Sequence, residues 1–336
     1  MSTTVSDTLR DVPVLVTGAS GFIGGRLAER LAVEAGARVV GTGRNFRDEA
    51  RLRAAGVELV KADLRDRDAM ARLCQGKQVV IHLAAWVQRG RGGEAEAHAI
   101  NVDATRMLAE VAAAASVQRF VLVSTVSAYG VPSVDDIDET VPLDFAQVDL
   151  YGRTKALGEQ AAQAVAKRTG LALSVIRPAM VVGPGSPGWT VGMLRLVQRG
   201  VPVLFGDGSG FAYPVYIDDV VDAILLAATR PEAVGEAFNV SGPSVDWATF
   251  FGHYGRMCGK RPRKVPMAIA RAIAWANERV KLGIPLTTDR LKIYVRRLRY
   301  PTEKAERSLG WTAKVSLDEG MRNSEAWLRS EGLLHP

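Results

Sequence analysis

Short apolar runs alternate with helix-like stretches through the first 180 residues of the chain. Residues 12–17, Val-Pro-Val-Leu-Val-Thr, indicate a buried strand, and residues 22–34 repeat apolar side chains at helical spacing. The same pattern predicts further strands near residues 37–42, 57–61, 78–83, 119–124 and 171–176. Between them it predicts helices near residues 46–54, 66–75, 94–116 and 149–169.

The predicted strands are apolar along their whole length. Val79-Val-Ile81 and Phe120-Val-Leu-Val123 show no alternation of apolar and polar positions. Strands of this kind are buried on both faces, as in parallel sheets that are covered by helices. We therefore predict an α/β fold with a doubly wound parallel sheet over residues 12–180.

The regular alternation ends after residue 180. Turns rich in Gly and Pro at residues 183–188 and 206–210 separate shorter elements. We expect residues 181–336 to form mainly a smaller C-terminal substrate-binding part, with some elements returning to the sheet of the first part. Residues 1–11 are polar, and we expect them to form a disordered leader.

The composition is that of a globular protein with a large core. Of 336 residues, 47% are apolar and 24% are charged. No stretch reaches the roughly 18 to 20 apolar residues of a membrane helix, and the polar N-terminus has no apolar signal core, so we expect a cytoplasmic protein. Cys74 and Cys258 lack the spacing of a disulfide framework or a metal site.

The net charge of +7 is unevenly distributed along the chain. Residues 256–299 carry thirteen Lys or Arg against Glu278 and Asp289. Such a basic stretch suits an acidic substrate, a membrane surface or nucleic acid, whereas a solvated face is the plainer interpretation. No nucleic-acid-binding motif accompanies it, so we expect no nucleic-acid partner.

A glycine-rich turn, Thr17-Gly-Ala-Ser-Gly-Phe-Ile-Gly24, lies between the first predicted strand and the first predicted helix. Glycine permits a positive φ and a close backbone approach, and the N–H groups at the start of a helix attract a pyrophosphate. A tight turn that merely needs glycine is the alternative. The placement favours a dinucleotide site on a Rossmann-type fold. The candidate contacts are Gly18, Ser20, Gly21, Phe22, Ile23 and Gly24.

A second motif, Tyr151-Gly-Arg-Thr-Lys155, falls within a predicted helix. Residues four apart lie on one face of a helix, so the Lys155 ammonium can sit beside the Tyr151 phenol. A fixed cation favours the phenolate and lowers the phenol pKa from near 10, which makes the tyrosine a usable acid or base. A structural role for the pair is the alternative.

The glycine turn and the Tyr-Lys pair together resemble the extended short-chain dehydrogenase/reductase family, also called the NAD-dependent epimerase/dehydratase family. Asp63-Leu-Arg-Asp66, His82-Leu-Ala-Ala85 and Asn101-Val-Asp-Ala-Thr105 agree with the resemblance. It implies that the Asp63 segment contacts adenine and that the His82 segment lines the cofactor. The contacts implied in this way are Asp63, Leu64, Leu83, Ala84, Ala85, Tyr151, Lys155 and Pro178.

The same resemblance implies partners for Tyr151. In Val123-Ser-Thr-Val-Ser-Ala-Tyr-Gly130, Thr125 precedes Tyr-Gly by four positions, where the family holds a Ser or Thr that orients the substrate oxygen. Ser124 and Ser127 are less favoured substitutes, and hydroxyls that only satisfy the backbone are the alternative. Asn101 is expected to support Lys155 through its backbone or a water.

The end of the second predicted strand bears on the choice between NAD and NADP. In Arg38-Val-Val-Gly-Thr-Gly-Arg-Asn45, Gly43 occupies the place where an acidic residue binds the ribose of NAD, and Arg44 follows. A guanidinium attracts a 2′-phosphate that a carboxylate would repel. We predict NADP as the preferred cofactor, with NAD as the alternative. An exposed arginine without this role is the plainer interpretation of Arg44.

Two positions argue against a nucleotide-sugar substrate. Family members of that class usually hold the diphosphate with an Asn and an Arg, and this chain has Met180 and Ala212 there. The resemblance is nearest to hydroxysteroid dehydrogenases and dihydroflavonol reductases. We therefore expect hydride transfer between NADP(H) and a hydrophobic secondary alcohol or ketone. The alternatives are an epimerase or isomerase with tightly bound, internally recycled NAD, and a non-catalytic NADP-sensing protein.

Residues 266–277 form an apolar-rich helical stretch with basic flanks. In the family, such a helix covers a hydrophobic substrate, although a plain core helix has the same pattern. The flanks also suit peripheral membrane contact or capture of an acidic substrate. These basic residues are Arg261, Arg263, Lys264, Arg279 and Lys281. The family resemblance also implies a homodimer, formed through the helix that carries Tyr151 and its neighbour.

Overall fold

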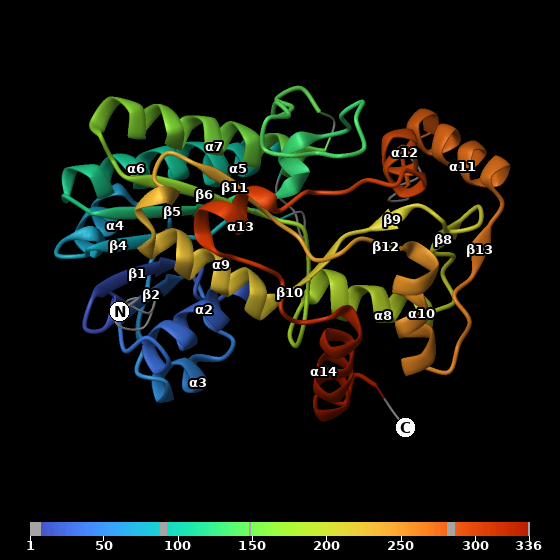
Figure 1. The fold of residues 1–336 in the computed structure, drawn as a ribbon, viewed down its shortest axis with the longest axis horizontal. Helices are drawn as coiled ribbons and strands as arrows, with labels where there is room; N and C mark the ends of the chain where they lie inside the picture. The colour runs from blue at the N-terminus through green and yellow to red at the C-terminus, as the bar shows by residue number, and fades with distance from the viewer. Residues whose placement is uncertain (1–7, 88–92, 148, 281–285, 335–336) are drawn as a thin grey trace.

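The computed structural model describes residues 8–87, 93–147, 149–280 and 286–334. Its centre is a sheet of seven parallel strands in the order β11-β6-β5-β4-β1-β2-β3 (Figure 1). These strands are β1 (Pro13–Thr17), β2 (Arg38–Gly43), β3 (Glu58–Lys61), β4 (Val79–His82), β5 (Arg119–Val123), β6 (Leu173–Pro178) and β11 (Ala237–Val240). The predicted doubly wound α/β fold is confirmed.

Helices cover both faces of this sheet, which explains the uninterrupted apolar strands. Every residue of β4 and of β6 is buried. One face is covered by α4 (Arg67–Cys74), α6 (Ala104–Ala114) and α7 (Leu150–Thr169), and the other by α2 (Phe22–Val33) and α9 (Ile217–Thr229) (Figure 1). The remaining elements of this part are α3 (Glu49–Ala54), α5 (Glu94–His98), η1 (Ala99–Asp103) and η2 (Val126–Tyr129).

Two sequence expectations change at this level. The helix predicted over residues 94–116 is broken into α5, the π-helical turn η1 and α6. The wide turn brings the Asn101 carbonyl against α7, so close that a Cβ atom at Gly158 would collide with it. Residues 8–11 do not belong to a disordered leader, because Leu9 is buried in the main core. Residues 1–7 lie outside the described residues.

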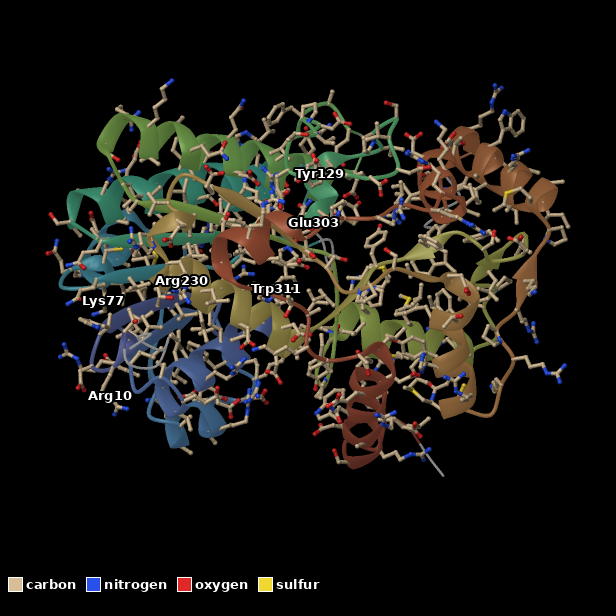
Figure 2. All side chains as sticks on the ribbon, viewed as in Figure 1. Arg10, Lys77, Tyr129, Arg230, Glu303 and Trp311 are labelled. Atoms are coloured by element: carbon tan, nitrogen blue, oxygen red, sulfur yellow. The ribbon has the colours of Figure 1, made fainter. Side chains whose placement is uncertain are left out.

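The second part of the chain contributes both to the sheet and to a separate lobe. β11 is the edge strand of the sheet, and α9 and α13 (Glu303–Leu309) lie against it. The indole of Trp311, a residue labelled in Figure 2, donates to the Asp219 carbonyl of α9 at 2.8 Å. The short strands form three pairs, β7–β10, β8–β13 and β9–β12. They are β7 (Met180–Val182), β8 (Leu204–Phe205), β9 (Phe211–Ala212), β10 (Pro214–Tyr216), β12 (Val245–Asp246) and β13 (Lys264–Val265).

The lobe has an aromatic core. Trp247 stacks on Phe251, 5.8 Å between ring centroids, and meets Tyr294 at 4.7 Å. The helices of this part are η3 (Pro187–Gly192), α8 (Met193–Gln198), η4 (Pro231–Ala233), α10 (Trp247–Met257), α11 (Met267–Val280), α12 (Thr288–Val295) and α14 (Leu317–Ser330). Among the described helices, none is long and apolar enough to cross a membrane.

Candidate cofactor and catalytic site

The glycine turn joins β1 to α2 and cannot carry side chains at two of its glycines. Gly18 has φ +74°, and a Cβ atom there would lie 2.7 Å from the Ala84 backbone nitrogen. A Cβ atom at Gly24 would collide with the Gly18 carbonyl oxygen. Gly21 caps α2 without a side-chain hydrogen bond, and the first turn of α2 holds no acidic residue. The uncapped N–H groups of α2 are therefore a site for a pyrophosphate.

The end of β2 lies beside this turn. A Cβ atom at Gly43 would lie 2.6 Å from the Ser20 Oγ, so an acidic side chain at position 43 would displace Ser20. Arg44 is exposed at the end of the same strand. It is close enough to Asp63, beyond the end of β3, to help lower the pKa of that carboxyl. The cationic group therefore stands where the 2′-position of a bound dinucleotide is expected.

Asp63 is held by a neighbour that the sequence analysis did not use. Arg65 donates from Nε to Oδ1 at 3.0 Å, and its Nη2 lies 2.5 Å from Oδ2. These bonds, more than any other cause, lower the pKa of Asp63 to about 2. The carboxylate stays ionised at neutral pH and can accept a hydrogen bond from an adenine amine. Leu64 follows it and is half-buried.

The segment after β4 closes the other side of the glycine turn. Leu83 donates its N–H to the Thr17 carbonyl at 3.2 Å, which draws Leu83, Ala84 and Ala85 alongside the turn. His82, at the end of β4, contacts the Thr17 hydroxyl at 2.7 Å and the Thr105 hydroxyl at 3.0 Å. Burial lowers the pKa of His82 to about 3, so the ring is neutral. Through these two contacts, His82 holds the ends of β1 and β4 against α6.

Tyr151, Lys155 and Thr125 come together at the start of α7. The Asp149 side chain caps this helix by accepting from the Gly152 N–H at 2.9 Å. Thr125 lies directly after β5, close enough to the Tyr151 hydroxyl to oppose the rise in the pKa of that phenol. The buried Lys155 donates from Nζ to the Val123 carbonyl at 2.8 Å. The structure thus places the predicted triad in one cluster.

The proton affinity of Tyr151 differs from the expectation. Burial and the nearby Asp149 carboxylate raise the pKa of Tyr151 to about 12, against the opposing effect of Thr125. The expected lowering by Lys155 is not found, because its ammonium is turned to the Val123 carbonyl. Burial also lowers the pKa of Lys155 to about 8. Tyr151 is therefore a protonated phenol at neutral pH.

The Asn101 side chain joins the segment after β4 to α7. Its Oδ1 accepts from the Trp86 N–H at 2.7 Å, and its Nδ2 donates to the Trp86 carbonyl at 3.1 Å. Nδ2 also contacts the Thr154 hydroxyl at 2.9 Å. No hydrogen bond within the described ranges joins Asn101 to Lys155. Asn101 therefore acts as a positioning residue that fixes the segment after β4 against α7.

Ser124 directly follows β5, between Val123, whose carbonyl accepts from Lys155, and Thr125. Its hydroxyl is buried and finds no hydrogen-bond partner among the described residues. A buried hydroxyl of this kind costs free energy unless a ligand satisfies it. Pro178, also buried, ends the neighbouring strand β6. The glycine turn, which has no room for a Cβ atom, and this hydroxyl without a partner both fit a site that binds a dinucleotide.

The sequence analysis missed a buried polar network behind the catalytic cluster. Arg177 of β6 pairs with Glu159 of α7, with 2.5 Å between Nη2 and Oε1. Arg177 also donates to the Tyr129 hydroxyl at 2.6 Å, and Tyr129 donates to Asn239 of β11 at 2.9 Å (Figure 2). The signal was available, because Arg177 is a charged residue within an apolar strand.

A model of the NAD-dependent epimerase/dehydratase family matches residues 14–241. The chain belongs to this family. The UDP-glucose 4-epimerase of Mycolicibacterium smegmatis is 32% identical to it over 94% of this chain and 98% of the relative. Sterol demethylase protein B of Methylococcus capsulatus is 29% identical over 95% of this chain and 99% of the relative. The resemblance drawn from the glycine turn and the Tyr-Lys pair is confirmed.

A solved structure shows what this NAD-dependent epimerase/dehydratase fold accommodates. MoeE5 in complex with UDP-glucose and NAD matches with a TM-score of 0.75 and 27% identity, covering 95% of this chain and 99% of that chain. The family and the relatives are NAD-dependent epimerases, dehydratases and dehydrogenases. By their names, some relatives act on nucleotide sugars and others on sterols. The family alone therefore does not determine the substrate of this protein.

Proposed function

We propose that this protein transfers a hydride between NADP(H) and a secondary alcohol or ketone on a hydrophobic molecule that carries no nucleotide. The observation that carries the proposal is the apolar character of two positions. Met180 on β7 is 2% exposed and Ala212 on β9 is fully buried, where nucleotide-sugar enzymes of the family hold a diphosphate with Asn and Arg. Neither side chain offers a hydrogen bond to a diphosphate.

The chain's own residues handle the proton in this reaction. Tyr151, protonated at neutral pH, donates its hydroxyl proton to the oxygen of the ketone as the alcohol forms. Thr125, which lies near that hydroxyl, orients the same oxygen, while Lys155 holds the end of β5 in place. Bound NADP(H) supplies or accepts the hydride.

The preference for NADP rests on the end of β2. Arg44 offers a guanidinium to a 2′-phosphate, and Ser20 occupies the space that an acidic ribose ligand at position 43 would need. Charge-assisted hydrogen bonds from a guanidinium to a phosphate are among the strong polar contacts in proteins. The broader family is NAD-dependent, so we attribute the preference for NADP to Arg44 and Ser20 of this chain.

An epimerase is the second candidate. The observation in its favour is the 32% identity to a UDP-glucose 4-epimerase over nearly the whole of both chains. In that reaction the same Tyr151, Lys155 and Thr125 would move the proton, while the hydride would return to the substrate within one cycle. The similarity to sterol demethylase protein B supports the first candidate instead.

The deciding experiment offers both substrate classes to the same protein. Hydrophobic ketones are incubated with NADPH, and UDP-glucose or UDP-galactose is incubated without added cofactor. The proposal expects one NADPH oxidised for each ketone reduced and no interconversion of the two sugars. Sugar interconversion without net cofactor oxidation would establish the epimerase and overturn the proposal.

A further inference from the structure

Helix α11 presents an apolar face to solvent. Ile269, Trp275 and Val280 are 52%, 57% and 68% exposed. Three of the ten large apolar side chains exposed in the described residues thus lie on one helix of 14 residues. The helical spacing sets Ile269, Ala272, Trp275 and Val280 on one broad side of α11. Exposed apolar groups that gather in this way mark an interaction surface.

The opposite side of α11 is already occupied. Ala270 and Ala274 are fully buried against Leu286 and Leu291, in a small core shared with α12. Asn277 donates from Nδ2 to the Leu286 carbonyl at 3.0 Å. The helix is therefore anchored through its inner side, and its outer side stays uncovered at the end of the lobe far from the sheet (Figure 1).

Cations surround the uncovered face. Arg271 and Arg279 lie on α11 itself, and Arg279 stacks over the Trp275 ring at 4.4 Å. Further exposed cations lie on the strand and loop that lead into the helix, namely Lys260, Arg261, Arg263 and Lys264. Within the described ranges, none of these six forms an ion pair with a carboxylate, and the one acid on α11, Glu278, is bonded to Thr288. Lys281 lies outside the described residues.

We infer that this face of α11 docks on an anionic lipid surface. An interfacial helix buries its apolar side chains at the boundary of headgroups and acyl chains, while its Lys and Arg meet lipid phosphates. Tryptophan is enriched at that depth because its ring is apolar and its N–H is polar. The proposed partner is thus a bilayer whose headgroups contain phosphate and are negatively charged.

Other occupants suit the face less well. A second copy meeting the same face by two-fold symmetry would bring two unpaired basic clusters together, which repel each other. Nucleic acid would satisfy the cations but leave Ile269 and Val280 against phosphates, where their apolar area gains nothing. Only a surface that offers both anionic groups and hydrocarbon matches both halves of the pattern.

The docking face is also connected to the catalytic cluster. α12, which packs on α11, carries Arg290, and Arg290 lies 3.7 Å from the Asp149 carboxylate that caps α7. The inference itself is independent of the proposed reaction, because it concerns binding to lipid.

Co-sedimentation of the full-length protein with vesicles tests the inference. At low salt we expect binding to vesicles of phosphatidylcholine mixed with phosphatidylglycerol, little binding to phosphatidylcholine alone, and loss of binding at high salt. Trp275→Glu and the double variant Arg271→Glu/Arg279→Glu should each weaken the binding by about tenfold or more. The matched control is Val33→Glu, because Val33 is 65% exposed on α2 and should leave the binding unchanged.

Three results would overturn the inference. The first is a protein that stays in the supernatant with anionic vesicles at low salt. The second is equal weakening by Val33→Glu and Trp275→Glu. The third is a dimer that Trp275→Glu dissociates, without any binding to vesicles, which would assign the face to a second copy. Because Trp275 and Val33 are both exposed, unchanged circular dichroism of the two variants shows that folding is not the cause.

Discussion

The sheet and the lobe bury their side chains differently. In the sheet, the buried polar residues are joined into networks, such as Glu159, Arg177, Tyr129 and Asn239. In the lobe, an aromatic cluster lies among the buried aliphatic side chains, and the Trp247 indole N–H has no partner among the described residues. The difference indicates that polar contacts fix side-chain positions in the sheet, whereas apolar packing fixes them in the lobe.

The largest expected effect comes from comparing a tyrosine at the catalytic cluster with a tyrosine of the lobe. Tyr151→Phe removes the proton donor and should lower turnover by about 10²-fold to 10⁴-fold, with cofactor binding nearly unchanged. Tyr213→Phe removes a hydroxyl of the lobe, on a ring whose centroid lies 4.8 Å from that of Tyr300, and should lower turnover by less than about tenfold. Steady-state kinetics and cofactor titration measure both variants. Equal losses of turnover would show that the division of roles is wrong.

The second effect compares a buried ion pair of the sheet with a surface pair of the lobe. Glu159→Ala leaves the Arg177 guanidinium, with a side chain 6% exposed, uncompensated in the interior, and should lower the free energy of unfolding by about 3–5 kcal/mol. Glu325→Ala on α14 breaks a surface pair with Arg329 and should cost about 0–1 kcal/mol. Chemical denaturation measures both. A Glu325 variant that is the less stable of the two would contradict the comparison.

The third effect tests the preference for NADP at the cofactor-binding end of the sheet. Arg44→Ala should weaken NADPH binding by about 10-fold to 100-fold, because a charged contact to the 2′-phosphate is lost. NADH binding should change by less than about twofold. Fluorescence titration of each reduced cofactor gives the two ratios. If NADPH and NADH binding fall by the same factor, the NADP preference is wrong.

The smallest effect is the pH dependence of stability that His82 contributes. Its pKa is about 3 in the folded protein, below the unfolded value near 6.5, so the unfolded chain binds the extra proton between these values. The contribution is complete above pH 6.5 and falls by about 1.4 kcal/mol for each pH unit below it. The free energy of unfolding should differ less between pH 6.5 and pH 5 for His82→Asn than for the unchanged protein. An identical difference would rule out His82 as its source.

Much of the sheet and its site could be predicted from the sequence. Local patterns carry that information, because the apolar runs of the strands, the turn Gly18–Gly24 and the four-residue spacing of Tyr151 and Lys155 each lie within one short segment. The orientation of Lys155 toward Val123 and the pairing of Arg177 with Glu159 could not be predicted, because they depend on strand order and on contacts between distant segments.

The lobe was less predictable for the same reason. Its strands are two or three residues long, too short for a periodic signal, and the contact of Trp247 with Tyr294 joins residues that are 47 positions apart. The substrate pocket therefore left no local motif beyond the replacements at Met180 and Ala212. The homodimer expected through α7 stays a prediction.

The proposed function requires a cofactor that acts as an exchangeable co-substrate of a net reduction. It is tested most directly by denaturing the purified, gel-filtered protein and quantifying any released dinucleotide, then titrating the sites that are empty. The account predicts empty sites that bind NADPH more tightly than NADH. One equivalent of NAD retained by each chain through gel filtration would contradict it and indicate an epimerase that recycles its cofactor.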